Sequence, residues 1–140
     1  MSDQNLDADK RRRQMERMQR DCFICDVVGV KLTDVGDGTA TAELVLTPKH
    51  LNGVGICQGG VLFSIADYAL AAAFNYTDES VLSLDVSISY CKSVKSGRIT
   101  ATARETARTR STALGDVVVA DEQGTVLAYA HGRGYVLKTR

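Results

Sequence analysis

The amino-acid sequence predicts an α+β fold in which a curved antiparallel sheet wraps around one central helix. The segment 59–74 has no proline, no glycine after its first two residues and many alanines, so we expect a buried helix there. Two segments before it and four after it alternate between apolar and polar residues, as half-buried strands do. A single long helix is buried most completely when so many strands curl around it.

The two strands before the helix are predicted to form a hairpin. Apolar residues alternate over 28–32, and residues 34–38 read Asp-Val-Gly-Asp-Gly, a composition typical of turns. Alternation resumes over 39–46, and the loop 49–58 then leads to the helix. The apolar face of this second strand is expected to consist of Ala40, Ala42, Leu44 and Leu46.

Four further strands are predicted after the helix, arranged as a meander. In the first of them, Leu82, Leu84, Val86 and Ile88 are expected to share one face, with Ser83 on the other. The predicted boundaries of the four strands are 81–90, 98–108, 109–120 and 125–137.

The N-terminal segment is charged and is predicted to be helical from Leu6 to Cys25. Met15, Met18 and Cys22 recur at spacings of three and four, which gives a narrow apolar stripe. Acidic residues are interspersed with the basic ones along this segment, which argues against a nucleic-acid-binding arm. We therefore interpret this segment as an amphipathic helix with solvated arginines.

Length and charge limit the class of protein. A chain of 140 residues fits one domain, which we place at 21–140 after a polar helical extension at 1–20. Its 17 basic and 17 acidic residues give no net charge, so no nucleic acid or anionic membrane is expected as a partner. No apolar run approaches the roughly 20 residues of a membrane span. The polar start lacks an apolar signal core, so we expect a cytoplasmic protein.

Cys22 and Cys25 form a C-x-x-C pair, but no metal site is predicted. Structural zinc takes four ligands, whereas no second pair lies at finger-like spacing, and His50 and His131 are isolated. A redox motif would be expected near a βαβ pattern, which the chain lacks. We expect all four cysteines to be reduced thiols.

Asp67 is the only charged residue in the apolar segment 59–74. A carboxylate inside a buried helix is costly unless it has a partner. Two explanations are open for Asp67: a structural hydrogen bond, or a catalytic role, since perturbed carboxylates cluster at functional sites.

The loop before the helix carries a recognisable motif. Residues 52–60 read Asn-Gly-Val-Gly-Ile-Cys-Gln-Gly-Gly, and Asp67 follows in the predicted helix. Together with the strand at 83–90 and the hairpin at 121–128, this order resembles the hotdog-fold acyl-CoA thioesterases of the phenylacetate-degradation (PaaI-like) type, over residues 21–136. That family's pattern is an asparagine, a His-Gly-Gly triplet and an apolar helix that carries an aspartate.

The resemblance implies a hotdog fold and a thioester hydrolase that converts an acyl-CoA to the free acid and coenzyme A. It implies no metal and no organic cofactor, because coenzyme A is part of the substrate. It also implies a homo-oligomer, either a homodimer or a homotetramer built as a dimer of dimers.

The helix start and Asp67 supply the groups that such a reaction needs. The first amides of a helix have no intrahelical acceptor and lie at the positive end of its dipole. The amides of Gly59 and Gly60 are therefore candidate donors to the oxyanion of a thioester, with Gly60 also contacting substrate. Asp67 can act as a general base on water or attack the carbonyl directly, and both routes stay open.

The spacing of these groups predicts a dimer. Gly59 and Asp67 are eight residues apart, which is roughly 12 Å along a helix axis. A reacting carbonyl must lie within about 3 Å of both the donor and the attacking group. Two antiparallel helices side by side meet this requirement, with Gly59 of one subunit facing Asp67 of the other.

Three more residues match positions that the resemblance marks as catalytic. Asn52 would position substrate or water, although an Asn-Gly turn explains it equally well. Ser83 would hold the water with its hydroxyl, although an exposed strand serine is as good an explanation. Gln58 stands where the family has histidine; its amide can donate a hydrogen bond but cannot carry a proton.

Coenzyme A carries phosphates, so its site needs cations. Arg108, Arg110 and Ser111 fall at a predicted turn between strands, where the resembled family has basic residues. We predict that they bind substrate; a solvated turn is the alternative.

Two other roles are considered for a hotdog protein. A non-catalytic acyl-CoA sensor would bind the ester without turnover, and the presence of Gln58 keeps this alternative open. A dehydratase would pair a histidine with the helix acid, but neither His50 nor His131 lies at a suitable place in the sequence.

Overall fold

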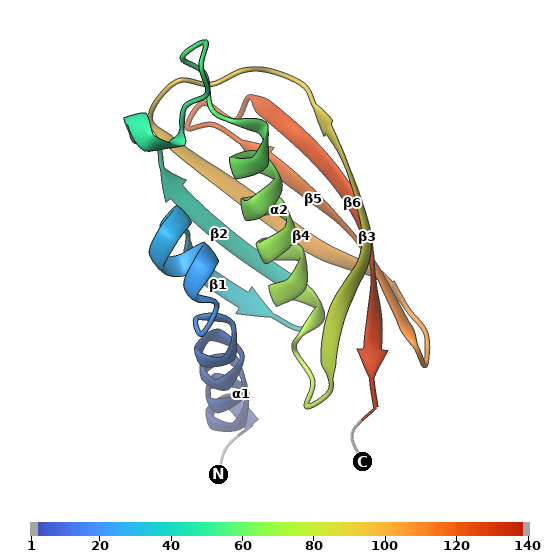
Figure 1. The fold of residues 1–140 in the computed structure, drawn as a ribbon. Coiled ribbons are helices and arrows are strands. Elements are labelled where there is room, and N and C mark those ends of the chain that lie inside the picture. Colours follow the sequence, from blue (N-terminus) through green and yellow to red (C-terminus); the bar gives the residue numbers. More distant parts are fainter. Residues whose placement is uncertain (1–2, 139–140) are drawn as a thin grey trace.

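In the computed structural model, which describes residues 3–138, a six-stranded antiparallel sheet curls around one long helix (Figure 1). The predicted α+β architecture is confirmed. The elements are α1 (Asp3–Met18), the π-helix η1 (Phe23–Val28), β1 (Lys31–Gly36), β2 (Thr39–Val45), the 3₁₀ helix η2 (Pro48–His50), α2 (Gly59–Phe74), β3 (Ser80–Tyr90), β4 (Arg98–Arg108), β5 (Thr112–Ala120) and β6 (Val126–Leu137).

The strand order is β1-β2-β4-β5-β6-β3, with every neighbouring pair antiparallel. The predicted four-strand meander is therefore wrong in one connection. Strands β4, β5 and β6 do form a meander, but β3 crosses the sheet to pair with β6, and β4 pairs with β2 instead. This crossover leaves β3 as an edge strand of the sheet.

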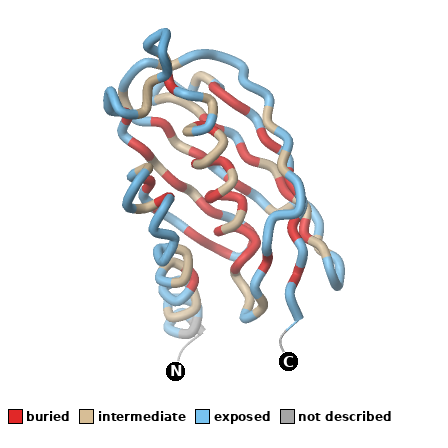
Figure 2. Tube along the Cα trace, in the orientation of Figure 1, coloured by how far each residue is buried: buried red, intermediate tan, exposed pale blue. Residues whose placement is uncertain are grey.

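The core lies between α2 and the concave face of the sheet (Figure 2). Strand β2 supplies an alternating buried face, and α2 turns one side toward it. The predicted face of the second strand is confirmed: the buried residues there are Ala40, Ala42, Leu44 and Leu46. The main helical contributors are Leu62, Ile65, Ala66, Ala69, Leu70, Ala73 and Phe74.

Helix α2 approaches β5 and β6 closely because glycines face it. A Cβ placed on Gly115 would lie 2.7 Å from the Arg104 carbonyl oxygen and 2.8 Å from Leu70 Cδ1. A Cβ on Gly132 would lie 2.5 Å from Leu70 Cδ2. Glycine inside a strand often marks such a close approach. The missing side chains let the helix sit against the sheet backbone.

The predicted helix at 6–25 is wrong in its C-terminal part. Helix α1 ends at Met18, and the separate π-helix η1 ends at Val28, followed by its C-cap Gly29, whose φ of 90° is left-handed. Met15 and Met18 pack against the core as expected, but Cys22 is exposed because it lies between the two helices. The first strand accordingly begins at Lys31, later than predicted.

Helix α1 is docked on the domain through polar side chains. Gln14 is 3 % exposed, and its Nε2 donates to the Ala72 carbonyl oxygen at 2.9 Å and to that of Gly36 at 3.3 Å. Arg17 donates to the Thr77 carbonyl oxygen at 2.9 Å and also to that of Asn75. The extension therefore covers the end of α2. The division into 1–20 and 21–140 stays a prediction.

Other features of the N-terminal region agree with the sequence. The arginines at 11–13 are exposed, as predicted. All four cysteines are free thiols. Within the described part of the chain, no helix is long and apolar enough to cross a membrane.

We expect Gly115→Ala to lower the free energy of unfolding by about 1 to 3 kcal/mol, because the added methyl overpacks the interface between α2 and β5. Urea denaturation measures the change. Gly53→Ala is the matched control, since nothing lies within 4 Å of a Cβ there and its φ is not left-handed. Equal stability of the two variants would contradict this account of helix packing.

Candidate active site

One face of α2 is not covered by the sheet, so the prediction of burial all round is wrong. We call this face the open stripe; it consists of the partly or fully exposed residues Gly60, Phe63, Ser64, Asp67 and Ala71. These positions recur at spacings of three and four, so they lie along one side of the helix. Asp67 thus sits at a helix surface, half-buried, and is not enclosed in the core.

Ser83 meets Asp67 because of a bulge in β3. The register of β3 on β6 shifts between Ser83 and Asp85. Bulges re-aim side chains, and here Ser83 Oγ donates to Asp67 Oδ1 at 3.0 Å. The prediction that Leu82, Leu84, Val86 and Ile88 share one face is wrong: Leu82 and Leu84 are exposed, at 57 % and 52 %, whereas Val86 and Ile88 pack against the core.

Burial and two neighbouring residues act on the pKa of the Asp67 carboxyl. Burial raises its pKa above the ordinary value, and the negative charge of Asp21 raises it further. The hydrogen bond from Ser83 opposes them and lowers the pKa. The net direction is upward, which moves the carboxyl toward the range in which a general base works well near neutral pH.

The two predicted oxyanion donors, the N–H groups of Gly59 and Gly60, differ in whether they already have a hydrogen-bond acceptor. Gln58 is the N-cap of α2, and its side-chain oxygen accepts from the Gly60 N–H. Among residues 3–138, the Gly59 N–H has no hydrogen-bond acceptor. Gly59 therefore keeps a free donor, whereas the Gly60 N–H is occupied. Gln58 itself acts as an acceptor here, not as the donor that its amide group could equally supply.

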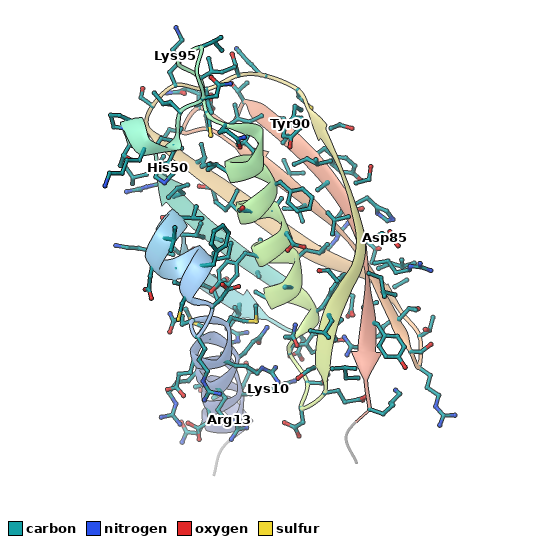
Figure 3. All side chains as sticks on the ribbon, viewed as in Figure 1. Lys10, Arg13, His50, Asp85, Tyr90 and Lys95 are labelled. Atoms are coloured by element: carbon teal, nitrogen blue, oxygen red, sulfur yellow. The ribbon has the colours of Figure 1, made fainter. Side chains whose placement is uncertain are left out.

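Tyr90 packs over this helix start (Figure 3). Its hydroxyl donates to the Gly59 carbonyl oxygen at 3.0 Å, and a Cβ on Gly59 would lie 3.2 Å from the tyrosine ring and hydroxyl. A cavity of about 290 Å³ opens beside them, lined also by Leu62 and Lys92. The sequence around Tyr90 does not predict this contact, because Tyr90 is brought to Gly59 only when β3 pairs within the sheet.

Asn52 lines the same cavity but uses its side chain within its own loop. Its Oδ1 accepts from the Val54 N–H at 3.1 Å and from the Ile56 N–H at 3.2 Å. This is the turn that the Asn-Gly pair suggested. A direct role of Asn52 with substrate stays a prediction.

The predicted phosphate-binding residues lie at the other end of α2. Arg108 Nη1 donates to the Phe74 carbonyl oxygen at 3.0 Å and pairs with Glu105 at 2.9 Å. Arg110 and Ser111 are exposed in the turn between β4 and β5. The 16-residue helix separates its two ends by about 22 Å. Within one subunit, these residues therefore do not join the helix start.

Neither histidine approaches Asp67. His50 accepts from the Thr47 N–H at Nδ1, 2.9 Å, so its Nε2 carries the proton donated to the Val28 carbonyl oxygen at 2.7 Å. His131 is exposed and its Nδ1 lies 2.7 Å from an Asp116 oxygen. No histidine is therefore paired with the helix acid, which argues against the dehydratase alternative.

Comparison with known proteins identifies the family. The family model described as "Thioesterase superfamily" matches residues 54–128, which include the helix start, all of α2 and Ser83. The chain belongs to the thioesterase superfamily. The predicted PaaI-like hotdog resemblance is confirmed by the relatives and by the fold that they share.

Two relatives, one of them also as a solved structure, illustrate the similarity. The acyl-coenzyme A thioesterase PaaI of Escherichia coli is 28 % identical over 109 residues, covering 77 % of this chain and 78 % of that protein. The 1,4-dihydroxy-2-naphthoyl-CoA hydrolase of Listeria monocytogenes is 28 % identical over 118 residues, covering 82 % and 96 %. The solved structure of the E. coli PaaI protein superposes with a TM-score of 0.87 at 24 % identity, covering 92 % and 94 %.

The raised pKa of Asp67 predicts how pH affects stability. The folded thioesterase holds this proton more tightly than the unfolded chain, so ionisation of Asp67 costs stability as pH rises through the folded-state pKa. Below pH 3.8, the ordinary pKa of this group, the carboxyl is mostly protonated in both the folded and the unfolded state, so that cost is absent. We expect Asp67→Asn to unfold at higher urea than wild type near pH 7, and at the same urea concentration near pH 3. A less stable variant at pH 7 would instead assign Asp67 a structural role.

Proposed function

We propose that this protein is an acyl-CoA thioesterase whose active site combines Asp67 of one subunit with the Gly59 amide of its partner. The supporting observation is the half-buried Asp67 carboxylate on the open stripe, oriented by the Ser83 hydroxyl. The names of the E. coli and Listeria relatives, both CoA-thioester hydrolases, support the substrate class. No metal or organic cofactor takes part in the proposed reaction.

Hydrolysis joins a water oxygen to the acyl carbon and breaks the carbon–sulfur bond. Asp67 would take the proton from the attacking water, and that proton then leaves with the coenzyme A thiolate. The alternative is direct attack by the carboxylate, giving an anhydride that water opens. In both routes negative charge develops on the carbonyl oxygen, where the free Gly59 N–H at the positive end of α2 would stabilise it.

Two features support a site shared between subunits. Along one helix, Gly59 and Asp67 are roughly 12 Å apart, too far to act on one carbonyl. The open stripe would bring an antiparallel copy of α2 alongside, with its Gly59 facing Asp67. The adjoining edge strand β3 exposes Leu82 and Leu84, and long apolar edges are typically covered by a partner. A second copy of the chain is the proposed partner; a dimer of dimers remains compatible with it.

Ser83 and Gln58 have supporting roles in this proposal. Ser83 would keep the Asp67 carboxylate turned toward the attacking water by its 3.0 Å hydrogen bond. Gln58 would hold the first turn of α2 in place through the Gly60 N–H, leaving Gly59 as the donor. Binding of coenzyme A by Arg110 and Ser111 stays a prediction.

We expect Asp67→Asn to lower kcat by about 100- to 10,000-fold, the range typical of a lost general base. Thiol release from a panel of aryl-acetyl and medium-chain acyl-CoAs measures it. Asp85→Asn is the matched control, because this exposed carboxylate lies on the same strand as Ser83 and pairs with Arg133 at 3.1 Å. Full activity of Asp67→Asn would exclude the proposed role. Tight acyl-CoA binding without turnover in the wild type would favour the sensor alternative.

The partner's amide can be tested by removing it. Gly59→Pro deletes the N–H at the first helical position, where proline is tolerated. The extended backbone of Gln58, with ψ of 135°, suits the residue before a proline. Gly59→Ala is the control, since it brings a similar contact with Tyr90 but keeps the N–H. We expect a large loss of kcat only in the proline variant.

Mixing the two inactive variants tests whether the site is shared. A mixed dimer of Asp67→Asn and Gly59→Pro has one site with both defects and one intact site. Because half of randomly reassorted dimers are mixed, we expect about a quarter of wild-type activity to return after joint refolding. If no activity returns although mixed dimers form, Asp67 and Gly59 act within one subunit.

A further inference from the structure

Tyr90 is bonded to the peptide group that joins Gly59 to Gly60. Its hydroxyl donates to the Gly59 carbonyl oxygen at 3.0 Å. The N–H of Gly60, at the other end of the same peptide group, donates to the side-chain oxygen of Gln58. Because a peptide group is planar, hydrogen bonds at both of its ends fix the orientation of the whole unit.

This restraint acts on a residue that has no side chain of its own. Glycine loses more conformational freedom on ordering than any other residue. The φ of Gly59 is not left-handed, so its backbone conformation does not call for glycine. Space does, because a Cβ there would lie 3.2 Å from the ring and hydroxyl of Tyr90. The tyrosine thus occupies the position of the missing side chain, and its hydroxyl holds the backbone that glycine leaves free to rotate.

The chain that carries Tyr90 is anchored to the sheet. Tyr90 is the last residue of β3, and the next residue, Cys91, donates its N–H to the Leu127 carbonyl oxygen at 2.7 Å. The loop before α2 is bound to the segment after β3, since the Cys57 N–H donates to the Val94 carbonyl oxygen at 2.7 Å. The helix start is therefore fixed relative to β3 by a backbone bond from the loop and by the bond from the tyrosine.

Helix α2 has supports at its start that do not involve Tyr90. Gln58 caps the helix, its carbonyl oxygen accepts from the Val61 N–H at 2.9 Å, and its own N–H donates to the His50 carbonyl oxygen at 2.9 Å. Tyr90 is 54 % exposed, so it buries little surface against the core. A hydrogen bond from so exposed a side chain adds little to folding stability. Its effect is concentrated on the geometry of Gly59.

We propose that Tyr90 is a positioning residue for the oxyanion donor, an inference that rests on the proposed thioesterase function. By fixing the peptide group after Gly59, its hydroxyl keeps the free N–H of that residue pointing in one direction. Among residues 3–138 this N–H has no acceptor. Such a donor stabilises a developing oxyanion best when it is oriented before the reaction. Both residues line the cavity of about 290 Å³ at the helix start, so a ligand there would meet both.

The first test is Tyr90→Phe, which removes the hydroxyl and keeps the ring. We expect kcat to fall about tenfold, the equivalent of one neutral hydrogen bond, with KM and the thermal unfolding temperature unchanged. Tyr135→Phe is the matched control: Tyr135 is 43 % exposed and pairs with Leu82, which lies about 26 Å before Tyr90 along β3. A kcat equal to that of wild type, or a raised KM with kcat unchanged, would overturn the proposal.

A double-mutant cycle distinguishes positioning from a general structural role. If the hydroxyl acts through the Gly59 N–H, Tyr90→Phe should cause no further loss of kcat in Gly59→Pro, where that N–H is already absent. The same substitution should still cost about tenfold in Asp85→Asn, whose carboxylate is exposed and paired with Arg133. An equal loss in both backgrounds would show that the hydroxyl acts independently of the Gly59 amide, which would overturn the proposal.

Infrared spectroscopy separates this inference from the proposed catalysis. The probe is a non-hydrolysable acyl-CoA analogue, in which a methylene group lies between the sulfur and a ¹³C-labelled carbonyl carbon. Hydrogen bonding to the carbonyl oxygen lowers its stretching frequency. We expect the band of the bound analogue to lie lower in wild type and Tyr135→Phe than in Gly59→Pro, with Tyr90→Phe between them.

The band reports the donor whether or not the protein turns over a thioester. A band that shifts in Tyr90→Phe as expected, with no hydrolysis of any acyl-CoA by wild type, would refute the proposed catalysis and leave the positioning role standing. A band that Tyr90→Phe does not move would overturn that role. If Tyr90→Phe moves the band and Gly59→Pro does not, the hydroxyl itself contacts the carbonyl, which overturns positioning through Gly59.

Discussion

The close packing of α2 against the sheet is the constraint on which the rest of the structure depends. Gly115 and Gly132 carry no side chain where the helix passes, so Leu70 reaches the strand backbone. Interiors packed this tightly transmit displacement and do not absorb it. Helix α2 is therefore held rigidly against the sheet, and the distance between Gly59 and Asp67 along it is fixed.

A rigid helix divides the proposed chemistry between two subunits. The proposed oxyanion donor, the Gly59 N–H, and the Asp67 carboxylate lie on one helix and cannot approach each other, so the proposed active site requires a second helix alongside. The fold leaves room for one, because the open stripe of α2 and the edge strand β3 adjoin each other at the contact of Ser83 with Asp67. In the proposal, the surfaces that would form the dimer would also form the active site.

The two ends of α2 differ in how their backbone hydrogen-bonding groups are satisfied. At its C-terminal end, Gln14, Arg17 and Arg108 all donate to backbone carbonyls, and two of the three are cations that match the negative end of the helix dipole. At its N-terminal end, Gln58 occupies one amide and Gly59 keeps a free one. Side chains thus donate to carbonyls at the C-terminal end of α2, whereas the N-terminal end, which is assigned to the oxyanion, retains a free N–H.

Local pattern was sufficient for the first hairpin and the central helix, whereas the site needed the tertiary structure. Alternation and alanine content predicted the hairpin and the helix at 59–74, and Asp67 stood out as the only charge there, because these signals depend on neighbours in sequence. The sequence left Ser83 undecided between site and surface; a bulge in β3 and its pairing with β6 turned it to Asp67. Neither the capping of Gly60 by Gln58 nor the path of β3 to the sheet edge follows from local pattern. Which strands pair, and which hydrogen-bond partner a side chain takes, depend on contacts between segments that are distant in the sequence. Only the folded structure decides these contacts.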